Sequence, residues 1–600
     1  MILNLKYKQW LHLQSELKHL QTVRHYIPKV VNKHNWKTAL KRLPTHNGAE
    51  LDEFLDNYER GMDIGLPEIP KPVHSKANPP MNMKANCKMA STIIKWHKKG
   101  YLMGPFDPSD PIAKECRINP VFCVPKPEDE VRPVVNYSKA IDGTSLNELL
   151  DPDWCTVEYI QLKEIVYTIK QVGVGAMVWA KDLEDGYFNI KVHPDQIKCI
   201  AFIFAGLLFI PMVMVFGLST APLIFTMFMW YAVSAIRYMD CDIMWFRMPS
   251  NQFERHYFQT DADIQTCEGG TWTFIPLIMY YLDDIFGVQT PQLVFKQYNM
   301  AGQMLKFLGL SAKASKDRPP NTTQILLGLE YDTIKQEVRV PREKVIRYTD
   351  FACRLMRMKQ VTKRELFSLT GKARYASVQC RALSSFARGV EVHGHQLKQW
   401  HYRINMSSRL KKDIRLIIEG LEYNQSKGKS FDFILKPRNC FDYQAYTDAS
   451  GAIGIGGYVN TDNAPFFQVT WKEMKDMLET DIQWKEMVAI CVLIECNLEL
   501  FKGKCINIFC DNQAVVWMLI KWRAPLHRTD LQHVLRRIAR LCIFNDIIPW
   551  WDHIEGSHNI TADRLSRFQY NPFEFAQVRP AKKPSVGARD SLQKCVDICL

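Results

Sequence analysis

Two adjacent aspartates, Asp283 and Asp284, stand at the centre of the apolar stretch YYLDDIFG, residues 280–287. Neighbouring carboxylates repel each other, and burying them without a partner costs several kcal/mol. A tight hairpin turn, where Asp is favoured, is one explanation. A shared divalent cation is the other, and it requires a strand end or turn, because successive strand side chains point to opposite faces. A metal site would also need a carboxylate from elsewhere.

Asp182 is the candidate for that further carboxylate. It stands where the apolar strand of GAMVWAKDLEDGYFNIKVHPD, from Gly175, comes to its end. If this strand lies beside the one at Asp283, three carboxylates converge. They could then hold two divalent cations about 4 Å apart, the arrangement that supports in-line phosphoryl transfer. Nucleotidyl transfer is the chemistry that this set predicts.

A second group of acids follows in the C-terminal region. Asp448 lies in the alternating strand of YQAYTDASGAIGIGGYV, and Asp511 ends the strand-like CINIFCD. Glu486 lies in DIQWKEMVAICVLIECNLELF, whose apolar residues recur at helical spacing, and Asp563 follows in GSHNITADRLSR. Like the first group, these four acids come from separate segments, here a strand, a helix, a strand end and a helix, so they too could form a metal site.

Several domains must position these acids, because 600 residues exceed what one core holds. Hydrophobic residues at 47% and charged residues at 23% are those of a globular chain. The net charge of +14 is compatible with a polyanionic partner. The 17 scattered cysteines form no CxxC, and the N-terminus lacks an apolar signal core. We therefore expect an intracellular protein with reduced thiols.

The longest uncharged run, from Cys199 to Ile236, exceeds the length that spans a bilayer. Gly206, Pro211, Gly217 and Pro222 divide it into short pieces, and Ser219 and Thr220 are placed to cap a helix with Pro222 in its first turn. We predict two buried strands and a buried helix, with a membrane segment as the alternative. Further on, Thr362 and Glu365 stand in capping-box register at the start of a basic, helical region.

Five ordered blocks give the chain a resemblance to reverse transcriptases. They are NPVFCVPKPEDEVRPVVNYS from Asn119, Asp182-Leu183 with Tyr187-Phe188, GLSTAP at 217–222, YLDD at 281–284 and ILLGLEYD from Ile325. The resemblance implies fingers and a palm over 81–345, with Asp182, Asp283 and Asp284 as catalytic Mg²⁺ ligands. A helical thumb or connection over 346–440 would follow.

The resemblance also implies roles for residues around this site. Lys126 and Arg132 match the cations that meet the incoming triphosphate, and Tyr187 matches the residue that excludes a 2′-hydroxyl. Gly217 lies where the family brings backbone close to the nascent base pair. Lys316, with Lys313 as the alternative, matches the lysine that donates a proton to the leaving pyrophosphate. Lys181 is unusual, since an apolar residue is common there; strand alternation points it away from the metals.

The four C-terminal acids, in order with TDAS, DNQAVV and N..AD, resemble those of ribonuclease H, where they hold two metals that hydrolyse RNA in a hybrid. This implies a ribonuclease H-like α/β domain over 441–570, with Asp448, Glu486, Asp511 and Asp563 as catalytic metal ligands. His553 and His558 are candidates for the family's mobile histidine. Residues 1–80 form an N-terminal extension, and 571–600 a basic tail or linker.

The closest resemblance is to DIRS-like and Ngaro-type retrotransposons, on HKKGYLMGPF, VHPDQ and CDNQAVVWM. The expected protein is an α+β multidomain enzyme, a right-hand polymerase followed by a ribonuclease H-like domain. It would be an RNA-directed DNA polymerase with ribonuclease H activity, using two Mg²⁺ per site, with Mn²⁺ as an alternative. Its partners would be RNA template, DNA primer, RNA/DNA hybrid and deoxynucleoside triphosphates, with no membrane, in the cytoplasm with access to the nucleus. The rivals are a catalytically silent nucleic-acid-binding remnant and a membrane protein.

Overall fold

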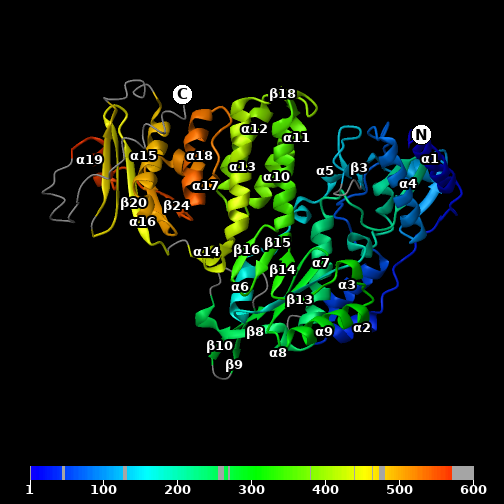
Figure 1. Cartoon of the computed structure of the whole chain (residues 1–600). Helices are drawn as coiled ribbons and strands as arrows, with labels where there is room; N and C mark the ends of the chain where they lie inside the picture. Colours follow the sequence, from blue (N-terminus) through cyan, green and yellow to red (C-terminus); the bar gives the residue numbers. More distant parts are fainter. Residues whose placement is uncertain are drawn as a thin grey trace. The chain divides into compact units, whose positions relative to one another are not determined.

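The computed structural model divides the chain into two compact units, Met1–Leu327 and Gly328–Leu600 (Figure 1). It describes residues 2–43, 48–125, 131–253, 263–267, 270–378, 380–437, 440–462, 464–471 and 480–569. Both units combine helices with sheets, so the expected α+β multidomain class is confirmed. Lys126 and the predicted tail after residue 570 lie outside the described residues.

A four-stranded antiparallel sheet carries the first group of aspartates. Its order is β11 (Ile278–Tyr281), β12 (Asp284–Gln289), β5 (Met177–Asp182) and β13 (Arg318–Asn321). The helices that contact it are α6 (Leu162–Val172), α7 (Ala221–Arg237) and α9 (Val294–Phe307). Trp179 of β5 is fully buried and donates a 2.8 Å hydrogen bond to Gln297 of α9, which fixes that helix on the sheet.

The long uncharged run folds as two strands and a helix, as predicted. β6 (Ala201–Phe204) and β7 (Leu207–Pro211) pair antiparallel in a sheet of order β1-β7-β6-β2, with β1 at Leu102–Phe106 and β2 at Ile118–Asn119. α7 begins with a proline in its first turn. Thr220 is the N-cap residue of α7, as predicted, but its side chain makes no capping hydrogen bond; its hydroxyl donates to the Ile64 carbonyl oxygen at 2.8 Å. Among the described residues, no helix combines the length and apolar character that a bilayer crossing requires.

The N-terminal segment belongs to the core of the first unit. Its helices are α1 (Ile2–Lys18), α2 (Lys33–Leu40) and α3 (Gly48–Arg60). Leu17, Trp36 and Leu55 are buried in the same hydrophobic cluster as the strands. The Trp36 indole donates a 3.2 Å hydrogen bond to the Leu308 carbonyl oxygen, so a residue near the start of the chain packs beside the end of α9.

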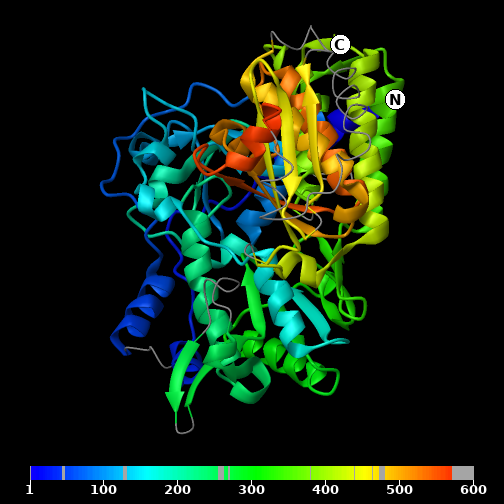
Figure 2. The same ribbon diagram turned by 90° about the vertical axis from the view of Figure 1, so that its left-hand side faces the viewer.

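The second unit contains four long helices: α10 (Arg342–Arg357), α11 (Lys363–Ala376), α12 (Leu383–His395) and α13 (Ser408–Lys427). They lie side by side in Figures 1 and 2, and contacts join α11 to α12, α12 to α13 and α10 to α13. The capping box predicted for Thr362 and Glu365 is confirmed at the start of α11. β15 (Leu329–Asp332), β16 (Glu337–Arg339) and β19 (Lys429–Ser430) pair beside them.

A five-stranded mixed sheet carries the second group of acids. Its order is β22 (Phe466–Thr470), β21 (Gly454–Val459), β20 (Tyr443–Ala449), β23 (Cys505–Cys510) and β24 (Ile548–His553). The first three strands are antiparallel, and β20, β23 and β24 are parallel. The helices of this part are α15 (Ile482–Cys496), α17 (Gln513–Lys521), α18 (Thr529–Phe544) and α19 (Ile560–Ser566). α15 and α19 contact β20, the strand that holds Asp448.

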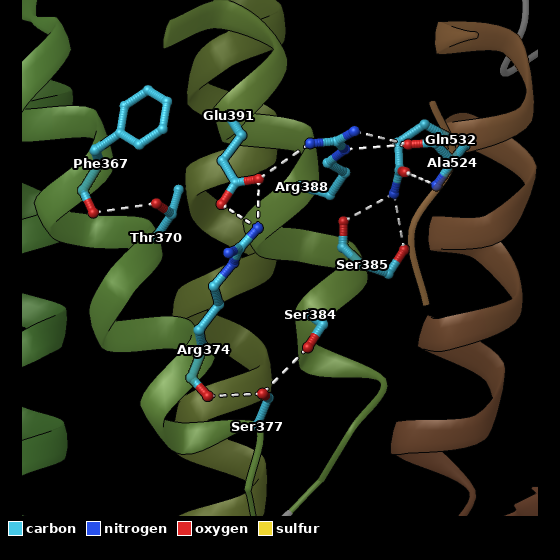
Figure 3. Close-up of polar contacts among 10 residues, drawn as sticks. All are labelled: Phe367, Thr370, Arg374, Ser377, Ser384, Ser385, Arg388, Glu391, Ala524 and Gln532. Atoms are coloured by element: carbon cyan, nitrogen blue, oxygen red, sulfur yellow. Dashed lines mark hydrogen bonds and ion pairs between the residues drawn. The ribbon is translucent and has the colours of Figure 1, made fainter. Parts of the chain in front are cut away.

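A buried polar network joins α12 to α18 within this unit (Figure 3). Glu391 of α12 has a side chain only 4% exposed and pairs with Arg374 at 2.7 Å and Arg388 at 3.4 Å. Arg388 donates two hydrogen bonds to the Ala524 carbonyl oxygen, at 3.0 and 3.1 Å. Gln532 donates to the Ser385 carbonyl oxygen at 3.0 Å. Because buried charges need partners, this network fixes the helices against the five-stranded sheet domain.

Candidate active sites

The first candidate site forms where β5 ends beside the β11–β12 hairpin. Asp182 and Asp284 are directly opposite each other in the antiparallel register. Tyr281 pairs with Asp284, so Leu282 and Asp283 form the two-residue turn, with Leu282 at a left-handed φ of 50°. The Leu183 N–H donates to the Asp283 carbonyl oxygen at 2.7 Å. The tight-turn explanation is therefore confirmed, and this turn also brings the two side chains to a strand end, as the cation explanation requires.

The electrostatics of this site record three crowded carboxylates. Asp182 is 8% exposed, and Asp283 and Asp284 are half-buried. Burial raises the pKa of Asp283, and the Asp182 carboxylate raises it further. Burial, followed by the charges of Asp283 and Asp182, raises the pKa of Asp284 to about 6. Burial and the neighbouring carboxylates therefore both disfavour the ionised forms of Asp283 and Asp284.

This donor set fits a hard divalent cation. Carboxylate oxygens are the ligands that Mg²⁺ uses in proteins, and a bound cation would remove the repulsion that raises the pKa values of Asp283 and Asp284. The sheet register supplies two of the three carboxylates from neighbouring strands, and the turn supplies the third. Asp182, Asp283 and Asp284 are thus the residues that could hold metal here.

Two cations of the chain approach the carboxylates. Lys316 lies in a short 3-10 turn, Ala314–Lys316, and its Nζ is 2.5 Å from Asp182 Oδ2. Lys313, the alternative, donates its backbone N–H to the Asp182 carbonyl oxygen at 2.8 Å. Arg132, an exposed residue of β4 (Val131–Val135), stacks its guanidinium 4.7 Å from the centre of the Phe216 ring. Both Lys316 and Arg132 lower the pKa of Asp283, which places their charges near the site.

Tyr187 and Gly217 also lie close to this end of the sheet. The Tyr187 ring packs 5.4 Å from that of Phe216 and 5.2 Å from that of Phe225. Burial raises the pKa of Tyr187 to about 12, with smaller effects from Tyr159 and Asp283. Gly217 has a φ of +123°, and a Cβ there would lie 2.2 Å from the Val135 carbonyl oxygen, so only glycine fits. The close approach that its conformation requires is therefore to β4.

The second candidate site forms on the five-stranded sheet, with each acid on its predicted element. Asp448 lies in β20, Glu486 in α15, Asp511 directly after β23, and Asp563 in α19. Asp448 and Glu486 are buried, at 4% and 2% exposure. The Ala449 N–H donates to Glu486 Oε1 at 3.1 Å, which joins the helix to the strand end. One ligand atom each of Glu486, Cys510 and Asp511 lies within 4.8 Å of the others.

These four acids also act on one another. Burial raises the pKa of Asp448 to about 6, and Asp511 and Asp563 contribute to the rise. The pKa of Glu486 is raised well above its ordinary value by burial and by Asp511 and Asp448. The pKa of Asp511 is raised by burial and by Asp563. The group is therefore a second set of oxygen ligands whose repulsion a divalent cation would relieve.

Three residues around the second site were not predicted from the sequence. Ser566 donates a 2.5 Å hydrogen bond to Asp448 Oδ2, and Arg567 pairs with Asp563 at 2.7 Å. The Cys510 thiol lies 3.6 Å from Glu486 Oε2. Ser566 follows Asp563 by one helical turn, so the i, i+3 spacing could have found it. His553 lies 3.0 Å from the Asp511 carbonyl oxygen, whereas His558 is exposed beside Glu555.

No protein-family model matches the chain, and no curated protein matches it in sequence. Among solved structures, a foamy viral protease-reverse transcriptase with double-stranded DNA is 14% identical, with a TM-score of 0.42, over 90% of this chain and 99% of that one. The same viral protein with an RNA/DNA hybrid is 15% identical, with a TM-score of 0.44, over 90% of this chain and 65% of the other. Its dRH form with double-stranded DNA is 14% identical, with a TM-score of 0.43, over 90% and 84%.

Proposed function

We propose that this chain is an RNA-directed DNA polymerase that copies retroelement RNA into DNA, with a ribonuclease H domain that degrades RNA in RNA/DNA hybrids. The observation that carries the proposal is the antiparallel pairing of Asp182 with Asp284, with Asp283 in the adjoining turn. It gathers three carboxylates, in the order of the reverse transcriptase blocks, at one strand end. The second set of four acids supplies the hydrolytic site that such an enzyme uses on its copied template.

At the polymerase site, each protein group acts on a different part of the reaction. Asp182, Asp283 and Asp284 would hold two Mg²⁺, which would supply Lewis-acid activation of the primer hydroxyl and charge stabilisation at the leaving oxygen. Arg132 contacts the phosphates of the incoming nucleotide, for which a guanidinium is well shaped. Tyr187 lies under the sugar and excludes a 2′-hydroxyl, which selects deoxynucleotides. Lys316 Nζ donates a proton to the departing pyrophosphate. Lys126 is proposed as a second phosphate contact.

At the nuclease site, Asp448, Glu486, Asp511 and Asp563 would hold two metal ions, which would supply the activation of water for hydrolysis of the RNA strand. Ser566 keeps Asp448 oriented through the hydrogen bond described above, and Arg567 does the same for Asp563. Mg²⁺ is the proposed metal at both sites, with Mn²⁺ as an alternative. The two activities together turn an RNA template into DNA that is free for second-strand synthesis.

The origin and setting of the enzyme belong to the same proposal. We place it with DIRS-like or Ngaro-type retrotransposons, on the motifs already quoted. Its partners are RNA template, DNA primer, the hybrid duplex and deoxynucleoside triphosphates, and it acts inside the cell, in the cytoplasm with access to the nucleus. Phosphate contacts by its Lys and Arg residues dominate template binding, which suits the net charge of +14.

Primer extension on an RNA template with deoxynucleotides and Mg²⁺ tests the polymerase assignment. The intact chain is compared with Asp283→Asn and with Asp195→Asn, a matched change at a side chain 80% exposed in the same unit. We expect extension by the intact chain and by Asp195→Asn, and none by Asp283→Asn or after addition of EDTA. Folded protein that binds hybrid but extends no primer would overturn the proposal and favour the silent remnant.

A further inference from the structure

Two lysine-aspartate dipeptides, Lys181-Asp182 and Lys316-Asp317, form a pair of crossed ion pairs at the polymerase site. Lys316 Nζ lies 2.5 Å from Asp182 Oδ2. Lys181 Nζ lies 3.2 Å from Asp317 Oδ1 and 3.3 Å from Oδ2. Each dipeptide thus presents one residue to the carboxylate site and the other to the opposite side of the sheet. The second pair contains Lys181, the unusual lysine that strand alternation directs away from the carboxylate site.

In the pair of Lys181 with Asp317, Lys181 is buried and Asp317 is partly buried, and a third residue holds them. The Lys181 side chain is 7% exposed and the Asp317 side chain 29% exposed. The Tyr298 hydroxyl of α9 donates a 2.5 Å hydrogen bond to Asp317 Oδ2, and Lys181 Nζ lies 3.5 Å from the centre of the Tyr298 ring. α9 approaches closely here, because a Cβ on Gly302 would lie 3.6 Å from Lys181 Cε. Asp317 is therefore held from both the strand and the helix.

Backbone hydrogen bonds also join residues 311–317, which include Lys316 and Asp317, to the end of β5. The Glu184 N–H donates to the Ser311 carbonyl oxygen at 2.7 Å, and the Lys313 N–H donates to that of Asp182 at 2.8 Å. Within the segment, the Lys316 N–H donates to the Lys313 carbonyl oxygen at 2.9 Å. The Lys316 side chain is itself 49% exposed. The position of the Lys316 side chain beside Asp182 is thus set by the backbone of residues 311–317.

An ion pair with one buried partner adds little to stability, because removing the Lys181 charge from water offsets much of its attraction to Asp317. An apolar residue at position 181 would pack against α9 equally well. The pair does fix the position of the Asp317 side chain, because both Lys181 and Tyr298 must reach its carboxylate. The adjacent Lys316 is then directed to the other face of the strand.

We propose that Lys181, Asp317 and Tyr298 are positioning residues that hold Lys316 at the edge of the carboxylate site, so that they set the rate of nucleotide addition without touching substrate. This inference rests on the proposed polymerase function. It assigns a task to a buried charge that the reaction itself does not use. It also predicts that all three residues act through Lys316 and lose their effect when Lys316 is absent.

The test compares steady-state primer extension by the intact chain, Lys181→Met, Tyr298→Phe and Lys316→Ala, and by the two double variants that add Lys316→Ala. Lys198→Met is the matched control, because Lys198 forms a surface pair with Glu115 at 2.5 Å and its side chain is 40% exposed. Hydrogen exchange of residues 311–317 is measured on the same proteins without metal. Ribonuclease H activity of each preparation reports the second unit.

We expect Lys181→Met to lower kcat by about 10-fold or more, with KM for the nucleotide changed less than about twofold, since misplacing a catalytic group affects the chemical step. Tyr298→Phe should lower kcat in the same sense. Neither change should lower activity further in the Lys316→Ala background. Exchange over 311–317 should be faster in Lys181→Met and Tyr298→Phe, but unchanged in Lys198→Met.

The inference is overturned if Lys181→Met and Tyr298→Phe retain the kcat of the intact chain, or if their losses persist in full without Lys316. If Lys181→Met does not fold, Tyr298→Phe, which removes only a hydroxyl, decides the matter. An intact chain that extends no primer would instead refute the proposed function. In that case, hydrogen exchange would still show whether Lys181 and Tyr298 hold residues 311–317, because exchange there would be faster in Lys181→Met and Tyr298→Phe than in the intact chain.

Discussion

Replacing Asp284 by Asn should stabilise the metal-free protein while removing polymerase activity. Asn keeps the shape of the side chain and removes its charge. Burial and the charges of Asp283 and Asp182 make that charge unfavourable, which is why the pKa of Asp284 rises from 3.8 to about 6. A carboxylate that lowers the stability of the protein in this way is expected at a functional site, and the role we propose for Asp284 is that of a metal ligand.

The size of this effect follows from proton linkage. Between pH 3.8 and about 6 the native state holds a proton on Asp284 that the unfolded state has lost, so stability falls as pH rises through this window. The difference in pKa of about 2 corresponds to about 3 kcal/mol at pH 7. For a unit of the size of Met1–Leu327, this is a rise of about 4 °C in Tm when the charge is removed.

Thermal unfolding in EDTA between pH 4 and pH 8 measures this difference. Asp284→Asn should unfold at a higher temperature than the intact chain above pH 6, and the gap should narrow as pH falls to 4, because the unfolded state also becomes protonated as the pH approaches 3.8. Asp195→Asn, at a side chain 80% exposed, should leave the Tm unchanged. Added Mg²⁺ should raise the Tm of the intact chain more than that of Asp284→Asn.

Either of two results would refute this reasoning. One is an Asp284→Asn protein with no higher Tm than Asp195→Asn at pH 7.5, which would mean that the carboxylates do not crowd one another. The other is a gain in Tm that grows as pH falls, because the linkage then has the opposite sign.

Other measurements test the roles of single groups. Tyr187→Val should let ribonucleotides in, lowering the ratio of kcat/KM for deoxynucleotides over ribonucleotides by about 10-fold or more; an unchanged ratio would remove Tyr187 from the sugar pocket. Arg132→Ala should raise KM for nucleotides about tenfold with a smaller change in kcat, and a loss confined to kcat would contradict a phosphate contact. Affinity for hybrid duplex should fall with the logarithm of salt concentration, with a slope of about −0.9 per phosphate neutralised; salt-insensitive binding would be evidence against it.

The sequence predicted local features well, because each depends on residues near in the chain. The strand end at Asp182, the turn at Asp283 and the capping box at Thr362 follow from apolar runs and from the residue types at their ends. The four acids of the second site also lie on the elements expected from their surroundings. Short-range patterns of this kind report alternation and helical periodicity directly.

Contacts between distant segments were beyond the reach of those patterns. Nothing near Lys181 indicates that Asp317 lies beside it, and nothing near Trp36 indicates the Leu308 carbonyl. Thr220 has the type and position of a helix cap, but its backbone is already helical, at φ −85° and ψ −19°, and its hydroxyl donates to the Ile64 carbonyl oxygen instead of accepting from a helix N–H. Such long-range partners are decided by packing, which composition and spacing do not record.

The central claim, two independent metal sites on one chain, is tested most directly by a reciprocal pair of variants. Primer extension and template cleavage are followed in the same tube for the intact chain, Asp283→Asn and Asp448→Asn. We predict that Asp283→Asn loses extension and keeps cleavage, and that Asp448→Asn loses cleavage and keeps extension. Loss of both activities in either well-folded variant, or of neither, would contradict the account.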